Sequence, residues 1–146
     1  MSHPEMPRVP FHLAFPVTNL EAIRAFYTLV LGCQVGRETD RWIDFDFFGH
    51  QITAHLDESA ASNGGFNQVD QKPIPARHFG AILLWEQWDQ LVDHIKSKNI
   101  AFYVKPYTRF KGEAGEQRTF FIQDPCDNYL EFKCFRDNTC IFQKTV

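Results

Sequence analysis

The fold is decided by residues 11–17, FHLAFPV, in which apolar side chains recur at every second position. That period is typical of a β-strand with one buried face, and the buried side chains would be Phe11, Leu13, Phe15 and Val17. His12 would then point to the opposite face. A second apolar stretch, residues 78–85 with the sequence HFGAILLW, also opens on a histidine, His78. Two histidines at matched places in two strands indicate a shared purpose.

The composition predicts a compact soluble protein, folded as a single domain over residues 1–146. The chain is 44% hydrophobic and 15% aromatic, with 15 phenylalanines, as expected for a packed core. Its net charge of -3 argues against a nucleic acid or an anionic membrane as the main partner. No run approaches the roughly 20 apolar residues that a membrane-crossing helix needs.

Cysteine usage and the N-terminal sequence predict a cytoplasmic protein. The N-terminal residues, MSHPEMPRVP, lack the apolar stretch of a secretory signal. No two cysteines have the CxxC spacing, which argues against metal binding or catalysis by thiols. We expect all four to be reduced, and they are Cys33, Cys126, Cys134 and Cys140.

The first half of the chain has the pattern of a βαβββ module, residues 8–57. After the strand at residues 11–17 comes an amphipathic stretch, residues 18–33, that predicts a helix capped by Thr18 or Asn19 and ended by Gly32. Two alternating segments follow, WIDFDFFG at residues 42–49 and HQITAHL at residues 50–56. They predict a hairpin that turns at Gly49 and His50.

The same order of elements returns in a second module, residues 76–136. The expected elements are a strand at 78–85, a helix at 86–99, a strand at 101–104, and a hairpin of 118–123 with 129–135. Residues 57–77, rich in Ser, Asn, Gly and Pro, are predicted to be a connecting loop, and residues 105–117 a second loop. The sequence therefore predicts an α+β fold of two βαβββ modules joined by a loop.

Hairpin registers predict which side chains face away from the helices. In the second hairpin, Ile122 opposite Leu130 and Phe120 opposite Phe132 would place Phe121 opposite Glu131, on the face away from the core. In the first, the expected pairs are Phe47 with Ile52, Phe45 with Ala54, Ile43 with Leu56, and Asp44 with His55. His55 would then be the structural counterpart of Glu131.

Each module thus offers two polar side chains from its first and last strands: His12 and His55, then His78 and Glu131. Three imidazoles and a carboxylate form a set of metal ligands. The alternative is that the two strand-entry histidines lie on a solvated sheet face and that the other two are surface residues. The remaining histidines are not ligand candidates, because His3 is in a tail, His50 in a turn and His94 on the polar side of a helix.

The sequence resembles the vicinal oxygen chelate superfamily, which contains glyoxalase I, fosfomycin and bleomycin resistance proteins, and extradiol dioxygenases. The resemblance covers residues 11–135 and includes DPCDNYLEF at residues 124–132. It implies an open, curved, mixed sheet around a cleft that holds one divalent metal, with His12, His78 and Glu131 as ligands. His55 would be a fourth ligand, as in glyoxalase-like members, or an acid–base group, as in dioxygenases.

A closer resemblance is to small two-module proteins predicted to be extradiol-dioxygenase-like, which share the motif FKGxxGEQ with residues 110–117. It implies an oxidoreductase that acts on a small catechol-like or vicinal-oxygen substrate. Fe(II) is the favoured metal, with Mn, Ni, Co or Zn as alternatives, and a homodimer is expected. A glyoxalase-type lyase or isomerase, or a small-molecule-binding resistance protein, are the alternative functions.

Two histidines and a carboxylate suit ring cleavage, because they leave about three positions on a six-coordinate Fe(II) for a bidentate substrate and O₂. The chain departs from the extradiol pattern in having Phe120 and Phe121 where a tyrosine precedes the ligand glutamate. Tyr129, on the predicted face of Glu131, is the candidate catalytic substitute, with Tyr107 as the alternative. Asp44 could orient His55. Lys111 and Glu116 could contact substrate from their loop.

Overall fold

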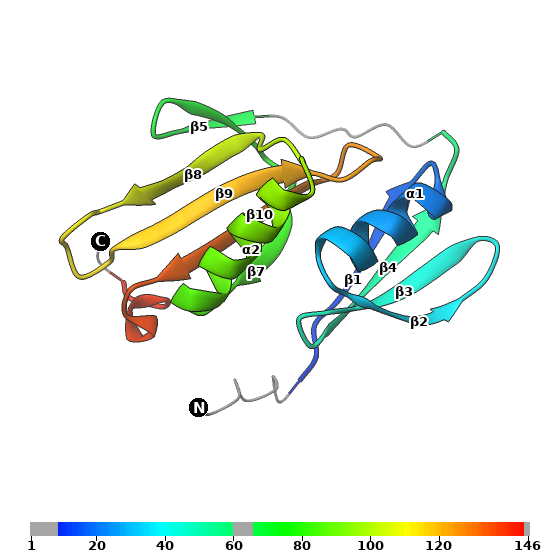
Figure 1. Ribbon diagram of the computed structural model, residues 1–146, viewed down its shortest axis with the longest axis horizontal. Helices are drawn as coiled ribbons and strands as arrows, with labels where there is room; N and C mark the ends of the chain where they lie inside the picture. The colour runs from blue at the N-terminus through cyan, green and yellow to red at the C-terminus, as the bar shows by residue number, and fades with distance from the viewer. Residues whose placement is uncertain (1–8, 60–65, 145–146) are drawn as a thin grey trace. The chain divides into compact units, whose positions relative to one another are not determined.

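The chain divides into two units, residues 1–61 and 62–146, and each is built on a four-stranded sheet (Figure 1). The computed structural model describes residues 9–59 and 66–144. The predicted tail residue His3, the start of the first module at residue 8 and the middle of the predicted connecting loop lie outside the described residues. No helix in the described ranges is long and apolar enough to span a bilayer.

The described part of the first unit, residues 9–59, contains one helical segment and four strands. They are β1 (His12–Val17), α1 (Leu20–Ala25) with its π-helical continuation η1 (Phe26–Val30), β2 (Gln34–Glu38), β3 (Trp42–Phe47) and β4 (His50–Leu56). The strand order is β1-β4-β3-β2, with β1 parallel to β4 and the other pairs antiparallel. Asn19 caps α1 as predicted, because its Oδ1 accepts a hydrogen bond from the Ala22 amide at 3.0 Å. Gly32, at φ +72°, follows the helix as expected.

The second unit repeats this order of elements and adds a small hairpin before it. Its elements are β5 (Phe66–Val69), β6 (Lys72–Pro75), β7 (Phe79–Ile82), α2 (Trp85–Ser97), β8 (Val104–Arg109), β9 (Gln117–Gln123), β10 (Tyr129–Phe135) and η2 (Asn138–Cys140). The strand order is β7-β10-β9-β8, with β7 parallel to β10. The prediction of an α+β fold with two βαβββ modules is therefore confirmed.

Each sheet buries the face that its helix covers. In the first unit the ring of Tyr27 stacks on Phe45 with centroids 5.0 Å apart, and both side chains are almost fully buried. In the second unit α2 places Trp88 against Phe120, and the Trp88 indole N–H donates to the carbonyl of Phe132 at 2.9 Å. The other face carries polar side chains in both sheets, and in the second unit the β5–β6 hairpin packs on part of it.

The register of the second hairpin is confirmed, but that of the first hairpin is wrong by two residues. Phe121 lies opposite Glu131 as predicted, whereas Asp44 lies opposite Thr53, and His55 lies opposite Trp42. The turn consists of Phe48 and Gly49, both at positive φ, so His50 is already part of β4. Because side chains alternate with a period of two, this displacement leaves every residue on its predicted face.

The strand predicted at residues 101–104 is also wrong, since β8 begins only at Val104 and runs through residues 105–109, which were expected in a loop. Pro106 lies within this strand. β8 is an edge strand whose register shifts between Val104 and Tyr107, and edges and bulges are the places where a sheet tolerates proline.

Part of the predicted connecting loop is in fact the hairpin of β5 and β6. Its turn residues, Asp70 and Gln71, both have positive φ, at 50° and 62°. That backbone suits the two-residue turns that join antiparallel strands. Pro73 and Pro75 in β6 hid this hairpin from a sequence-based prediction, and a two-stranded sheet accommodates them.

The register of the first hairpin generates a stability prediction. Thr53 Oγ1 donates to Asp44 Oδ1 at 2.6 Å, and both residues are only 6% exposed. Thr53→Val keeps the shape but leaves a buried carboxylate without this donor, so the free energy of unfolding should fall by about 1–3 kcal/mol. Urea denaturation measures the change.

Thr108→Val, at an exposed position of β8, is the matched control and should change stability by no more than about 0.5 kcal/mol. Equal small effects at both positions would contradict the observed pairing of Asp44 with Thr53.

Candidate metal centre

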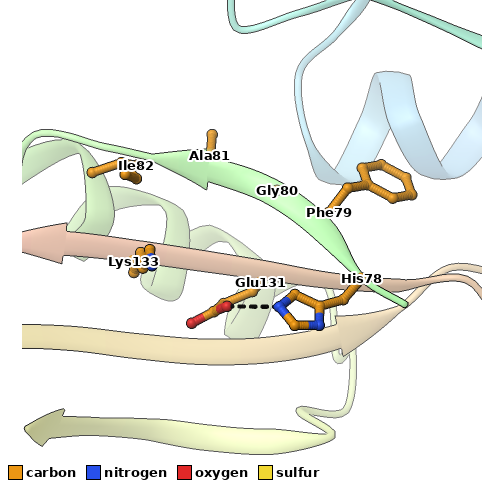
Figure 2. A pocket seen from close by; sticks show the side chains of 7 residues that line it. All are labelled: His78, Phe79, Gly80, Ala81, Ile82, Glu131 and Lys133. Atoms are coloured by element: carbon orange, nitrogen blue, oxygen red, sulfur yellow. Dashed lines mark ion pairs between the residues drawn. The ribbon is translucent and has the colours of Figure 1, made fainter. Parts of the chain in front are cut away.

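The candidate site lies on the face of the second sheet that α2 does not cover. Along β10, Leu130, Phe132 and Cys134 are fully buried, whereas the alternate residues Tyr129, Glu131 and Lys133 are only partly buried. Alternation along the strand therefore sends Glu131 away from the helix-covered core. Figure 2 shows the side chains of Glu131 and His78 pointing toward each other, while Phe79 and Ala81 point away.

Strand β7 comes unusually close to Glu131 because Gly80 has no side chain. Gly80 is the register partner of Glu131, and a Cβ built on it would lie 1.5 Å from the Glu131 carbonyl oxygen. This approach leaves a pocket of about 230 Å³ along β7. Its lining residues are His78, Phe79, Gly80, Ala81, Ile82, Glu131 and Lys133.

His78 and Glu131 form a partly buried ion pair in this pocket. The Nε2 atom of His78 lies 3.1 Å from Glu131 Oε2, and the two side chains are 30% and 19% exposed. The other carboxylate oxygen accepts a hydrogen bond from Thr119 Oγ1 at 2.8 Å. The ring of His78 packs edge-on against Phe121, with centroids 5.2 Å apart. Both donor groups are therefore oriented by their neighbours.

The electrostatics of the pair favour a negative carboxylate. Burial alone would raise the pKa of Glu131, but the hydrogen bonds from His78 and Thr119 outweigh it, and the pKa lies below its usual value. The hydrogen bond to Glu131 raises the pKa of His78 against the opposing effect of burial, with help from the Pro75 carbonyl. The proton between His78 and Glu131 thus stabilises the pair, with the imidazole protonated and the carboxylate ionised.

The geometry of the pair also fits a divalent cation in place of that proton. Two donors that each lie about 2.1 Å from one ion, at right angles, are about 3.0 Å apart, close to the observed separation of His78 and Glu131. His78 Nδ1 lies 2.7 Å from the Pro75 carbonyl oxygen, which makes Nε2 the nitrogen available for a metal. Within the described ranges, no group of three His, Cys, Asp or Glu side chains comes together. The second unit therefore contributes two donors to any such centre.

In the first unit, His12 and His55 lie on the same sheet face but not side by side. The parallel register pairs His12 with Gln51 and Pro16 with His55. His55 is thus four residues along the strand from the level of His12, or about 13 Å at 3.3 Å per residue. Both side chains are exposed.

The same registers show that Thr53, not His55, is the counterpart of Glu131. In the second unit Gly80 pairs with Glu131, and His78 precedes Gly80 by two residues. In the first unit Ala14 pairs with Thr53, and His12 precedes Ala14 by two residues. The sequence-based equivalence of His55 with Glu131 is wrong because it relied on the shifted register of the first hairpin. Asp44 likewise contacts Thr53 rather than orienting His55.

The other candidate residues have varied surroundings. Tyr129 lies on the Glu131 face, with its ring against Tyr103 at 4.9 Å, and burial raises its pKa. The Tyr107 hydroxyl donates to Asp70. Glu116 accepts from the Gly112 amide and pairs with Arg136, so its carboxylate holds its own loop together. Lys111 is exposed.

Sequence reasoning missed three groups that shape the pair: Gly80, Thr119 and the Pro75 carbonyl. Thr119 could have been found from the correct register of the second hairpin, because it lies diagonally across from Glu131. The role of Gly80 requires the parallel register of β7 with β10, and that of Pro75 requires the unpredicted strand β6. Neither has a local sequence signal.

Comparison with known proteins identifies relatives of the whole chain. Residues 10–132 match the family described as the Glyoxalase/Bleomycin resistance protein/Dioxygenase superfamily. The chain is 34% identical to a crystal structure of a glyoxalase/bleomycin resistance protein/dioxygenase from Alicyclobacillus acidocaldarius, with a TM-score of 0.77, covering 95% of this chain and 100% of that one. No curated protein matches at a significant level.

More distant structures share the fold alone. The fosfomycin resistance protein FosX from Listeria monocytogenes is 15% identical, with a TM-score of 0.69, over 93% of this chain and 100% of that one. Lactoylglutathione lyase from Agrobacterium tumefaciens is 16% identical, with a TM-score of 0.62, over 88% and 92%.

The close approach at Gly80 gives a second prediction. Gly80→Ala would place a methyl group against the Glu131 backbone, so β7 must move away from β10, and the free energy of unfolding should fall by at least about 2 kcal/mol. Urea denaturation of Gly115→Ala is the control, because a Cβ there meets nothing within 4 Å. A Gly80→Ala protein as stable as the control would contradict the packing of β7 on β10.

Proposed function

Because the chain belongs to the glyoxalase/bleomycin resistance protein/dioxygenase superfamily, we propose that it is a metal-dependent enzyme of that superfamily, an extradiol dioxygenase-like oxidoreductase. The observation that carries the proposal is the pairing of His78 with Glu131 at 3.1 Å in a pocket on the open face of the second sheet. The substrate would be a small catechol-like or other vicinal-oxygen compound.

His12, His78 and Glu131 are the proposed metal ligands. His78 and Glu131 come from one unit, so His12 must reach them from the other unit of the same chain or from the second subunit of a homodimer. Fe(II) is the favoured metal, with Mn, Ni, Co or Zn as alternatives. The free thiols of all four cysteines agree with the cytoplasmic location that the sequence predicts.

Three protein ligands suit a dioxygenase better than four. Thr53 stands where a fourth ligand would be expected from the repeat, and its hydroxyl is already bonded to Asp44. Two histidines and one carboxylate leave positions for a bidentate substrate and O₂, and the bound ion would supply charge stabilisation for both. A set of three protein ligands therefore favours ring cleavage over a glyoxalase-type lyase or isomerase that uses four ligands.

The chain's own residues would orient the ligands and handle protons. Thr119 holds the Glu131 carboxylate by a hydrogen bond, so that the other oxygen faces His78. Tyr129 lies on the Glu131 face, and burial raises the pKa of its hydroxyl, which could donate a hydrogen bond to a substrate oxygen. His55, exposed on the open face of the first sheet, is the candidate acid–base group; because it lies about 13 Å along the sheet from the level of His12, this role requires a substrate that extends from the metal toward the end of β4.

The test of this function is anaerobic reconstitution followed by an oxygen-uptake assay. We expect the protein with Fe(II) to consume O₂ with at least one member of a catechol panel, and Glu131→Gln or His12→Ala to lose both stoichiometric metal and turnover. His94→Ala, on the exposed side of α2, is the matched control and should keep both. Isomerisation of a thiohemiacetal without oxygen uptake would favour the glyoxalase-type alternative, and ligand binding without metal would favour a resistance protein.

The role of His55 is tested separately. Since His55 is not the register counterpart of Glu131, His55→Ala should retain stoichiometric metal at the affinity of the unaltered protein. Its turnover should fall by about 10²- to 10⁴-fold, the usual effect of removing a general acid–base group. Metal titration by calorimetry and steady-state kinetics measure the two effects. A loss of metal affinity equal to that of His12→Ala would instead make His55 a ligand.

A further inference from the structure

Resting on the proposed metal centre, we infer that the β5–β6 hairpin is a positioning element for His78, clamped to the sheet by the hydroxyls of Tyr107 and Tyr103. The hairpin contacts the second sheet at three places: its turn, the middle of β6 and the end of β6. Only the last of these touches His78 directly. The contacts at the turn and at the middle of β6 determine where the end of β6 lies.

The turn of the hairpin is held by Asp70. Its Oδ2 accepts a hydrogen bond from the Tyr107 hydroxyl at 2.9 Å and lies 2.5 Å from Arg109 Nε. The ammonium group of Lys72 lies 4.2 Å from the centroid of the Tyr107 ring. Burial and the hydrogen bond to Asp70 raise the pKa of Tyr107 to about 12, so its hydroxyl remains a donor at neutral pH.

The middle of β6 is held by a second tyrosine and by apolar packing. Tyr103 donates from its hydroxyl to the Pro73 carbonyl at 3.0 Å. Ile74, only 6% exposed, packs in a cluster with Val104 of β8 and Phe121 of β9. The hairpin is therefore seated on the same sheet face that carries Glu131.

The end of β6 reaches the candidate ligand itself. The Pro75 carbonyl oxygen lies 2.7 Å from His78 Nδ1, and the ring of His78 rests against Phe121. His78 precedes the first ladder residue of β7, Phe79, so strand pairing does not fix it. Its ring orientation depends on the Pro75 carbonyl, on Phe121 and on Glu131.

This arrangement couples the hairpin to metal binding. The bond at Nδ1 selects the nitrogen that faces Glu131, and outer partners of this kind typically contribute 10- to 100-fold to metal affinity. A hairpin released from the sheet would let the Pro75 carbonyl and the His78 ring separate. Tyr107 and Tyr103 would then act as positioning residues without touching metal or substrate.

The experiment compares Tyr107→Phe, Tyr103→Phe and the double variant, which remove only the two clamping hydroxyls. In the metal-free protein, NMR of ¹⁵N-labelled histidine should detect the His78 Nδ1 proton in slow exchange, and the double variant should lose that protection. With Co(II) alone as the probe, calorimetry should give an affinity about tenfold weaker for the double variant. Val92→Ala is the control, because this buried residue of α2 affects stability from the other face of the sheet.

Val92→Ala should leave both the Nδ1 proton and the Co(II) affinity unchanged while its melting temperature falls. An unchanged Nδ1 proton in the double variant, or losses in Val92→Ala as large as those in the double variant, would overturn the positioning role. If the unaltered protein bound no Co(II), the proposed function would fail, and the NMR comparison in the metal-free protein would still decide the role of the hairpin.

Discussion

Parallel pairing of β7 with β10, at the distance that Gly80 permits, is the constraint on which the candidate site depends. It brings a histidine at the entry of one strand next to a carboxylate in the middle of another, far away in the sequence. The interaction between His78 and Glu131 then follows from the alternation of β10, which sends Leu130 and Phe132 into the core and Glu131 out of it. Core packing and site geometry are thus set by the same register.

The two units use one topology for different polar pairs. In the second unit a threonine of β9 supports a carboxylate of β10, and that carboxylate faces a histidine. In the first unit the carboxylate is that of Asp44 in β3, and Thr53 of β4 donates a hydrogen bond to it. The position equivalent to Glu131 is therefore occupied by Thr53, so His12 has no acidic residue there. The repeat therefore places a histidine at the equivalent position of both units but a carboxylate beside it only in the second unit.

Sequence reasoning predicted the repeated modules, the helix-covered faces and the second hairpin, because period-two alternation and helical spacing are local signals. It failed where the backbone depends on left-handed turn residues or on edge strands. Phe48 at positive φ shifted the first hairpin by two residues, and Pro106 and Pro73 concealed strands at sheet edges. This error affected the predicted site, because it made His55, rather than Thr53, the counterpart of Glu131 in the first unit. Gly80 and the Pro75 carbonyl act through contacts between strands that have no local sequence signal, whereas Thr119 could have been found from the register of the second hairpin.

Anomalous X-ray diffraction from crystals loaded with Co(II), collected on both sides of the metal absorption edge, tests the central claim most directly. We expect one strong anomalous peak about 2.0 to 2.3 Å from His78 Nε2, a Glu131 oxygen and an imidazole nitrogen of His12, with His55 outside bonding distance. A peak bonded to His55, or a protein that holds Co(II) away from His78 and Glu131, would contradict it.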